Sequence, residues 1–184
     1  MKSMREQILE VSERLFMSQG YKKTSTRQIA EILGITQPNL YYHFKKKEDI
    51  YVAIMESLSE EVYHNLENIR KTEDSTMEKL HSMLLYLHKR HPFDFNTMIH
   101  DINYNLSKEV GEKLFRLWKK SYHQPFMSLL ESREDRLRKN IDIGLAVHQL
   151  FVLLSRYMEP DWEKKNIDED LNKALDMFLY GILE

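Results

Sequence analysis

The sequence predicts an all-α protein of about nine helices. Its 184 residues include only five Gly and four Pro, so few positions interrupt a helix. The runs of Val, Ile and Thr that a sheet needs are missing, and Leu, Glu, Lys and Met dominate instead. Apolar residues recur at three- and four-residue spacing, which is the period of an amphipathic helix. Because 42% of the residues are hydrophobic, the chain can bury the core of one domain, or of a small domain joined to a larger one.

The first helix is expected over residues 4–19. Ser3 and Glu6 form a capping-box pattern at its start, and Gly20 ends it. Its apolar residues fall on one face, which predicts that they pack inward: Ile8, Val11, Leu15 and Phe16.

Residues 24–44 predict two short helices joined by a tight glycine turn, which is a helix-turn-helix. Such a motif places its second helix in the major groove of DNA. The outward side chains of that helix therefore decide what the chain recognises. Four signals mark the helix ends: a capping box of Ser25 with Gln28, a stop at Gly34, the cap Thr36, and Pro38 in a first turn.

The chain beyond this motif predicts longer helices. The helix after the basic linker 45–47 keeps its apolar spacing from Ile50 to Ile69, so it is expected to join the two ends of the protein. A later helix that opens at Ser107 must bend or break near Pro125, because proline cannot donate a backbone hydrogen bond. The further expected helices cover residues 75–90, 95–102, 107–130, 134–158 and 171–183.

The charge of the chain is divided unevenly. The formal net charge is −2, but residues 1–47 carry nine Lys and Arg against four Glu. The remaining residues carry eighteen basic and twenty-five acidic side chains. A basic amino-terminal end suits contact with phosphates. Ordinary variation in surface composition would give the same split, so charge alone does not decide the function.

Several classes of protein are excluded by composition. The chain has no Cys, which rules out a disulfide framework, a thiolate zinc site and a thiol redox sensor. It shows neither a leading signal segment nor an apolar run of the roughly 20 residues that span a bilayer, so a cytoplasmic protein without a membrane partner is expected. His81, His88 and His91 share a helical face, but no further ligand motif accompanies them and no metal site is predicted. No nucleophile elbow, phosphate loop or dinucleotide fingerprint appears, so neither enzyme activity nor a cofactor is predicted.

One pattern extends beyond the helix-turn-helix, over residues 21–50. It consists of Tyr21, Thr24-Ser25-Thr26, Ile29-Ala30, Gly34-Ile35-Thr36, Tyr41-Tyr42-His43-Phe44, Lys47 and Ile50. This pattern resembles the amino-terminal signature of the tetracycline-repressor-like (TetR) family of bacterial transcriptional regulators. The resemblance implies a three-helix DNA-binding domain over residues 1–49, with its motif at 25–44, and a helical ligand-binding and dimerisation domain over residues 50–184. The rest of the chain is similar to the family only in layout and in the ending Phe178-Leu179-Tyr180-Gly181-Ile182.

The resemblance also implies a function. The chain is expected to be a homodimeric repressor that binds a palindromic operator on double-stranded DNA and leaves it when a small apolar or amphipathic molecule binds. The long helix at 50–69 would transmit that signal, as the one element expected to touch both parts. Two alternatives stay open. One is a DNA-binding factor without a small-molecule ligand, and the other is an enzyme or interaction module that uses the same scaffold without binding DNA.

The expected DNA contacts come from the same resemblance. Gln37 and Asn39 are the expected base readers because side-chain amides pair bidentately with adenine, although Asn39 could instead cap the backbone locally. Tyr41 and Tyr42 offer flat faces to thymine methyl groups and hydroxyls to phosphates, although either ring could simply be packed. Thr26 and Lys47 would grip phosphate. The full expected set is Thr26, Thr36, Gln37, Asn39, Tyr41, Tyr42, His43 and Lys47.

Two further sets of residues are expected in the larger domain. Apolar and aromatic residues that would line an effector pocket, or form plain core, are Met83, Tyr86, Phe95, Met98, Trp118, Tyr122, Phe126 and Phe151. His100, Asp101 and His148 could orient a polar head of the ligand, or could be ordinary satisfied or exposed residues. The last two helices would pair with their mates in a dimer, or form the centre of a monomer, through Ile141, Leu145, His148, Val152, Leu175, Phe178, Leu179 and Ile182.

Overall fold

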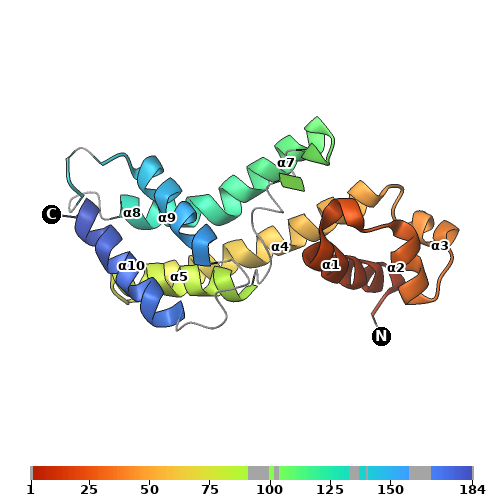
Figure 1. The fold of residues 1–184 in the computed structure, drawn as a ribbon, viewed down its shortest axis with the longest axis horizontal. Coiled ribbons are helices and arrows are strands. Elements are labelled where there is room, and N and C mark those ends of the chain that lie inside the picture. Colours follow the sequence, from red (N-terminus) through yellow and green to blue (C-terminus); the bar gives the residue numbers. More distant parts are fainter. Residues whose placement is uncertain are drawn as a thin grey trace. The chain divides into compact units, whose positions relative to one another are not determined.

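The computed structural model describes residues 2–90, 100–101, 104–132, 137–139, 141–157 and 167–183. Within these ranges every regular element is a helix, and the one β-type contact is an isolated bridge between Leu137 and Leu183 (Figure 1). The predicted all-α fold is confirmed. The expected helix at 95–102 lies mostly outside the described residues. No helix in the described ranges combines the length and the apolar character that crossing a bilayer requires.

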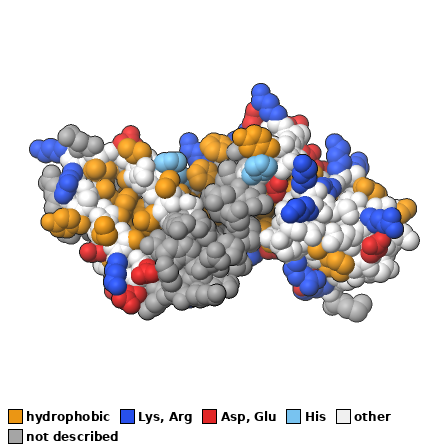
Figure 2. Space-filling view, in the orientation of Figure 1, with side chains coloured by type: hydrophobic (Ala, Val, Ile, Leu, Met, Phe, Trp, Pro, Cys, Tyr) orange, Lys and Arg blue, Asp and Glu red, His pale blue; other side chains and the backbone are white. Residues whose placement is uncertain are grey.

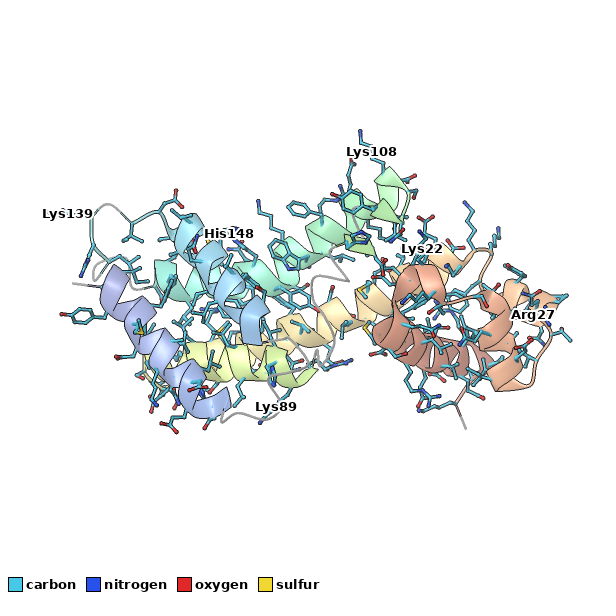
Figure 3. The ribbon with its side chains drawn as sticks, viewed as in Figure 1. Lys22, Arg27, Lys89, Lys108, Lys139 and His148 are labelled. Atoms are coloured by element: carbon cyan, nitrogen blue, oxygen red, sulfur yellow. The ribbon has the colours of Figure 1, made fainter. Side chains whose placement is uncertain are left out.

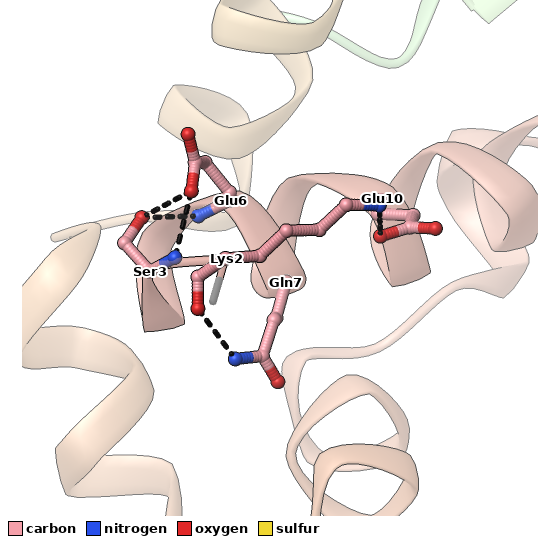
Figure 4. A network of polar contacts seen from close by, with 5 residues as sticks. All are labelled: Lys2, Ser3, Glu6, Gln7 and Glu10. Carbon is pink, nitrogen blue, oxygen red and sulfur yellow. Dashed lines mark hydrogen bonds and ion pairs between the residues drawn. The ribbon is translucent and has the colours of Figure 1, made fainter.

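Helix α1 spans Met4–Lys23 and starts as predicted. The Glu6 amide donates to Ser3 Oγ at 3.3 Å, while the Ser3 amide donates to a Glu6 carboxylate oxygen at 2.7 Å (Figure 4). Gly20 interrupts the helix where the sequence predicts its end. It adopts φ 81° and ψ 167°, a conformation that favours glycine, and one short helical turn, residues 21–23, follows this kink.

Helices α2 (Thr26–Leu33) and α3 (Gln37–His43) form the predicted helix-turn-helix. Gly34 ends α2 in the left-handed conformation, and the Asn39 amide donates to the cap Thr36 Oγ1 at 3.4 Å. The capping box at α2 is only half formed. Ser25 Oγ accepts from the Gln28 amide, but Gln28 Oε1 accepts from Gln19 Nε2 instead of reaching back to Ser25.

The remaining helices are α4 (Lys47–Arg70), α5 (Thr76–Arg90), α7 (Lys108–Trp118), α8 (Gln124–Glu131), α9 (Ile143–Tyr157) and α10 (Ile167–Ile182). The break expected near Pro125 is a π-helical turn, Lys119–His123, between α7 and α8. Such a wider turn accommodates a residue that has no amide hydrogen to donate. Helix α9 begins at Ile143, later than the expected residue 134, because Asp142 caps it by accepting from the Leu145 amide at 2.8 Å.

The chain divides into two compact units. The first comprises residues 1–59 and 96–117, and the second comprises residues 60–95 and 118–184, so that α4 contributes to both. The first unit is larger than the three helices expected at residues 1–49, since it also includes α7 up to residue 117. Buried apolar side chains fill each unit: Ile8, Ile29, Leu40 and Ile50 in the first, and Leu66, Leu80, Met83, Leu84, Phe126, Leu150 and Leu171 in the second.

Candidate nucleic-acid interface

Helix α3 has one buried face and one exposed face. Leu40 is fully buried, and Phe44 directly after the helix is nearly so, which anchors α3 to its own unit. Gln37, Asn39 and Tyr42 are exposed, and Tyr42 keeps 86% of its surface accessible. No hydrogen bond of the Asn39 side chain is found among the described residues, because Thr36 supplies the helix cap. The outward face therefore carries an amide pair and an aromatic ring, which are groups that contact base edges.

Thr26 joins α2 to α3. Its Oγ1 lies 3.1 Å from the Tyr41 hydroxyl, and Gln37 Nε2 donates to the same oxygen at 3.5 Å. Thr26 is buried, whereas Tyr41 remains partly accessible. The three residues predicted as separate DNA contacts are thus joined by hydrogen bonds where α2 meets α3, and two of them, Gln37 and Tyr41, remain exposed. A hydroxyl in this place fixes the relative position of the two helices.

Lys47 also contacts its own chain. Its ammonium donates to the carbonyl oxygens of Tyr21 at 2.8 Å and Thr24 at 2.9 Å, and lies 3.9 Å from the centre of the Tyr21 ring. Burial lowers the pKa of Lys47, while the nearby Asp101 carboxylate opposes that shift. These contacts do not support the predicted phosphate contact of Lys47, which stays a prediction. They give this side chain a structural part in holding the α1–α2 connection.

The sequence of this unit matches a known family model. Residues 8–54 match the model described as bacterial regulatory proteins, tetR family. The chain also superposes on PfmR of Thermus thermophilus, a TetR family transcriptional regulator, with 26% identity, a TM-score of 0.72, and coverage of 94% of this chain and 97% of that one. The amino-terminal region of this chain, residues 8–54, belongs to the TetR family.

Two further relatives extend this result. The transcriptional repressor KstR2 of Mycolicibacterium smegmatis is 30% identical over 83 residues, which are 45% of this chain and 40% of the relative. The match therefore spans less than half of that relative. FadR of Bacillus subtilis, solved in complex with stearoyl-CoA, has a TM-score of 0.73 at 18% identity and covers 96% of this chain and 98% of its own. This likeness shows the fold alone.

Exposed cations lie around the helix-turn-helix, and the space-filling view shows Lys and Arg side chains at several places on the surface of the first unit (Figure 2). Arg27 projects outward from α2 (Figure 3) and pairs with Glu31 at 2.8 Å. Four further lysines of this unit are exposed, at the end of α1 and in the linker after α3: Lys22, Lys23, Lys45 and Lys46. Sequence reasoning did not include Lys22 and Lys23 among the expected contacts, although the excess of basic residues in this part of the chain pointed to them. An exposed lysine at the surface suits a phosphate better than Lys47 does.

A groove of about 450 Å³ lies beside the carboxyl end of α3 within the first unit. Its walls come from α1, the α3–α4 linker, α4 and α7. The guanidinium of Arg5 lies 4.9 Å from the centre of the Phe44 ring, and Lys113 pairs with Glu56 at 2.6 Å. Because the walls mix acids, bases and apolar groups, the groove favours no single class of ligand.

The residues predicted to line an effector pocket gather in the second unit. The rings of Trp118 and Phe126 lie 5.5 and 5.4 Å from that of Phe151, and His123 stacks on Phe151 at 6.2 Å. Met83 and Tyr122 are buried, and burial raises the pKa of the Tyr86 hydroxyl to about 12. Phe95 and Met98 lie outside the described residues. A cluster of this kind suits both a core and the wall of an apolar pocket.

The three residues considered for a polar ligand head belong to different units. Asp101 is buried in the first unit, where it accepts from the Tyr21 amide at 2.7 Å. His100 is exposed, with its ring 4.9 Å from that of Tyr104, and His148 is exposed on α9 of the second unit (Figure 3). Asp101 therefore has a partner of its own within the DNA-binding unit.

The predicted dimer residues divide into exposed and buried sets. Leu145, His148 and Val152 of α9 are exposed. Leu175, Leu179 and Ile182 of α10 are buried, because α10 packs against α5 and α9 of the same unit (Figure 1), and Ile141 and Phe178 are half-buried. Two exposed apolar residues of α10 were missed by sequence reasoning, Met177 at 76% and Tyr180 at 82% accessible. A helical pattern alone does not tell which side of an apolar helix its own chain covers.

Proposed function

We propose that this chain is a homodimeric, sequence-specific repressor that acts in the cytoplasm and leaves a palindromic operator when a small apolar or amphipathic molecule binds. The observation that carries the proposal is the exposed polar face of α3, held in place by the buried Leu40 and Phe44. Gln37 and Asn39 stand on that face beside Tyr42. Residues with these side chains on the second helix of a helix-turn-helix discriminate between base pairs in the major groove.

A dimer is supported by the apolar surface of the second unit. Leu145 and Val152 on α9, with Met177 and Tyr180 on α10, expose large apolar side chains. Where such residues form a contiguous patch, the patch is typical of a surface that another chain covers. Two recognition helices would also bind two half-sites separated by one helical turn of DNA, about 34–36 Å, or by multiples of it, which multiplies affinity and selectivity.

An amphipathic effector is supported by the aromatic cluster around Phe151 and by one relative. FadR of Bacillus subtilis was solved in complex with stearoyl-CoA, a molecule with a long apolar chain and a charged head. The cluster of Trp118, Phe126 and Phe151 offers apolar surface of the same chemical character. A coupling free energy of roughly 1–3 kcal/mol between effector and operator would lower DNA affinity about 5- to 150-fold.

The test is fluorescence anisotropy with the DNA upstream of the gene that encodes this chain. Wild type and two variants, Tyr42→Ala and Tyr104→Ala, are titrated in the presence of unrelated duplex. Tyr104 is a matched control because it is exposed in the same unit but lies outside the helix-turn-helix. We expect Tyr42→Ala to lose roughly 1–3 kcal/mol of binding free energy and Tyr104→Ala to bind as wild type does. Equal binding by all three proteins would refute the assignment of α3 as the reading helix.

The effector arm uses stearoyl-CoA and free stearate as probes. We expect one of these to release the wild-type protein from its operator at concentrations below those that form micelles. Binding of a probe to the protein without any change in operator affinity would contradict the proposed coupling.

A further inference from the structure

The connection between α1 and α2 is bonded tightly by its own side chains. Gly20 turns the chain with its positive φ, and the Thr24 hydroxyl donates to the Gly20 carbonyl at 2.9 Å. Gln19 Nε2 in turn donates to Thr24 Oγ1 at 3.1 Å. These bonds shape residues 20–24 locally. They leave the amide of Tyr21 and the carbonyls of Tyr21 and Thr24 to partners from elsewhere in the first unit.

Asp101 supplies the partner for the amide. Its carboxylate accepts from the Tyr21 N–H at 2.7 Å and from Asn105 Nδ2 at 2.7 Å, and the residue is only 4% exposed. A buried carboxylate is costly unless its oxygens are hydrogen-bonded, and such bonds are about twice as strong as neutral ones. Asp101 lies 80 residues further along the chain than Tyr21. This contact therefore ties a distant segment to the entry of the helix-turn-helix.

Lys47 supplies the partner for the carbonyls. Its ammonium donates hydrogen bonds to the carbonyl oxygens of Tyr21 at 2.8 Å and Thr24 at 2.9 Å. Tyr21 thus donates its amide hydrogen to the Asp101 carboxylate and accepts at its carbonyl oxygen from the Lys47 ammonium. The Asp101 charge acts on Lys47 in the direction that keeps the lysine protonated.

We propose that Asp101 and Lys47 form a two-sided clamp on the α1–α2 connection, and that Asp101 is a positioning residue for DNA binding. The connection leads directly into Thr26, the first residue of α2. Thr26 Oγ1 is bonded to the Tyr41 hydroxyl of the recognition helix α3. A displacement of Asp101 would therefore change the orientation of the DNA-reading face through two contacts: its bond to the α1–α2 connection, and the bond between Thr26 and Tyr41.

The clamp adds contacts within the first unit that the sequence does not predict. The sequence predicts α4 as the element that transmits a signal to the helix-turn-helix, but Asp101 also contacts Tyr21 in α1, and the Ser107 amide donates to Glu48 of α4 at 2.7 Å. Release of the clamp gives the protein a second way to change the orientation of α3. Such regulation of α3 by release of the clamp rests on the proposed ligand response, whereas the positioning role of Asp101 does not.

Hydrogen exchange tests the clamp without DNA. The variants are Asp101→Ala, Asp101→Asn and the control Glu112→Ala, which removes an exposed acid from α7 of the same unit. For Asp101→Ala we expect exchange in peptides covering residues 17–30 and 37–44 to rise roughly tenfold or more, since a hydrogen bond to a charged group is lost. Peptides from α5 and the control variant should exchange as wild type does. Asp101→Asn should show a smaller rise, because its carboxamide oxygen can still accept from the Tyr21 amide.

Operator binding provides the second readout. Asp101→Ala should weaken specific binding roughly tenfold while leaving the salt dependence unchanged, because no phosphate contact is removed. Unchanged exchange over residues 17–44, or an equal rise in α5, would overturn the proposal by showing no local role. If Asp101→Ala does not fold, Asp101→Asn must by itself show the faster hydrogen exchange over residues 17–30 and 37–44. If wild type binds no operator, the proposed function fails while the exchange experiment still decides the clamp.

Discussion

Each of the two units has an apolar core, and the first adds polar bonds at the entry to its helix-turn-helix. In the first, short polar bonds join residues far apart in sequence, such as Asp101 to Tyr21 and Lys47 to Thr24. In the second, aromatic and aliphatic side chains such as Phe126 and Phe151 pack against one another. Directional bonds fix an orientation, whereas apolar packing stabilises in proportion to the area buried. The contrast suits a unit that must present one helix accurately and a unit that can admit ligands of varied shape.

The largest expected effect tests the apolar packing of the second unit. Phe126→Ala removes a fully buried ring from the second unit and should lower the free energy of unfolding by about 3–5 kcal/mol. Urea denaturation followed by circular dichroism measures it. Phe115→Ala is a matched control because more than half of that ring is exposed, and it should change stability by less than about 0.5 kcal/mol. Similar losses for the two variants would contradict the packing described here.

The next effect separates base reading from phosphate contact in the first unit. Asn39→Ala should cost about 1–3 kcal/mol of binding to the operator and relax the preference for one base pair. Lys46→Ala should weaken binding to all sequences alike and reduce the salt slope by about 1. Titrations at several salt concentrations, with operator and unrelated duplex, give both quantities. A salt slope that falls for Asn39→Ala but not for Lys46→Ala would reverse the two assignments.

Helix caps give a smaller effect that compares the units directly. Thr36→Ala and Ser75→Ala each remove a hydroxyl that accepts from a helix amide, and each should cost about 0.5–2 kcal/mol of stability. Only Thr36→Ala should also weaken DNA binding, because its helix carries the reading face. Thermal melts and operator titrations of the same two preparations test this. Weakened DNA binding by Ser75→Ala to the same degree would show that the two units are not separable.

The smallest effect is a dependence on pH in the second unit. Burial, with Lys119 and His148 nearby, lowers the pKa of His123 below its usual 6.5. The unfolded chain therefore binds this proton more readily, so the stability contributed by neutral His123 is present above pH 6.5 and decreases as the pH falls below it. Melting temperatures between about pH 7.5 and 5 should decrease less in His123→Gln than in wild type. His64→Gln, which removes an exposed histidine of the same unit that does not act on His123, should follow wild type.

Local signals made the helix-turn-helix predictable from sequence. Ser3, Gly34 and Thr36 act where the sequence predicts, because caps and turns depend on neighbouring residues. The capping box predicted at Ser25 is only half formed because the Gln28 side chain accepts from Gln19, nine residues earlier, instead of from Ser25. Lys47 and Thr26 lie at positions typical of phosphate contacts, yet both are bonded inside the unit. No local pattern reports such a long-range partner.

The second unit was predictable only in outline. Apolar spacing predicts helices there, but it does not show that Leu175 faces inward while Met177 faces outward. The sequence assigns Asp101 to the ligand-binding domain, whereas the structure has it in the first unit, where it accepts from Tyr21, 80 positions away. The spacing of apolar residues along the chain does not predict tertiary contacts of this kind.

The most direct test of sequence-specific recognition by α3 is selection from genomic DNA. Purified protein is mixed with sheared DNA of the source organism at physiological salt, and the retained fragments are sequenced. We expect the retained fragments to share a palindromic motif, and Asn39→Ala to lose that enrichment while still retaining DNA weakly. Fragments without a common motif, recovered equally by wild type and variant, would show that the unit contacts phosphates only and would contradict the assignment of α3 as a reader of base sequence.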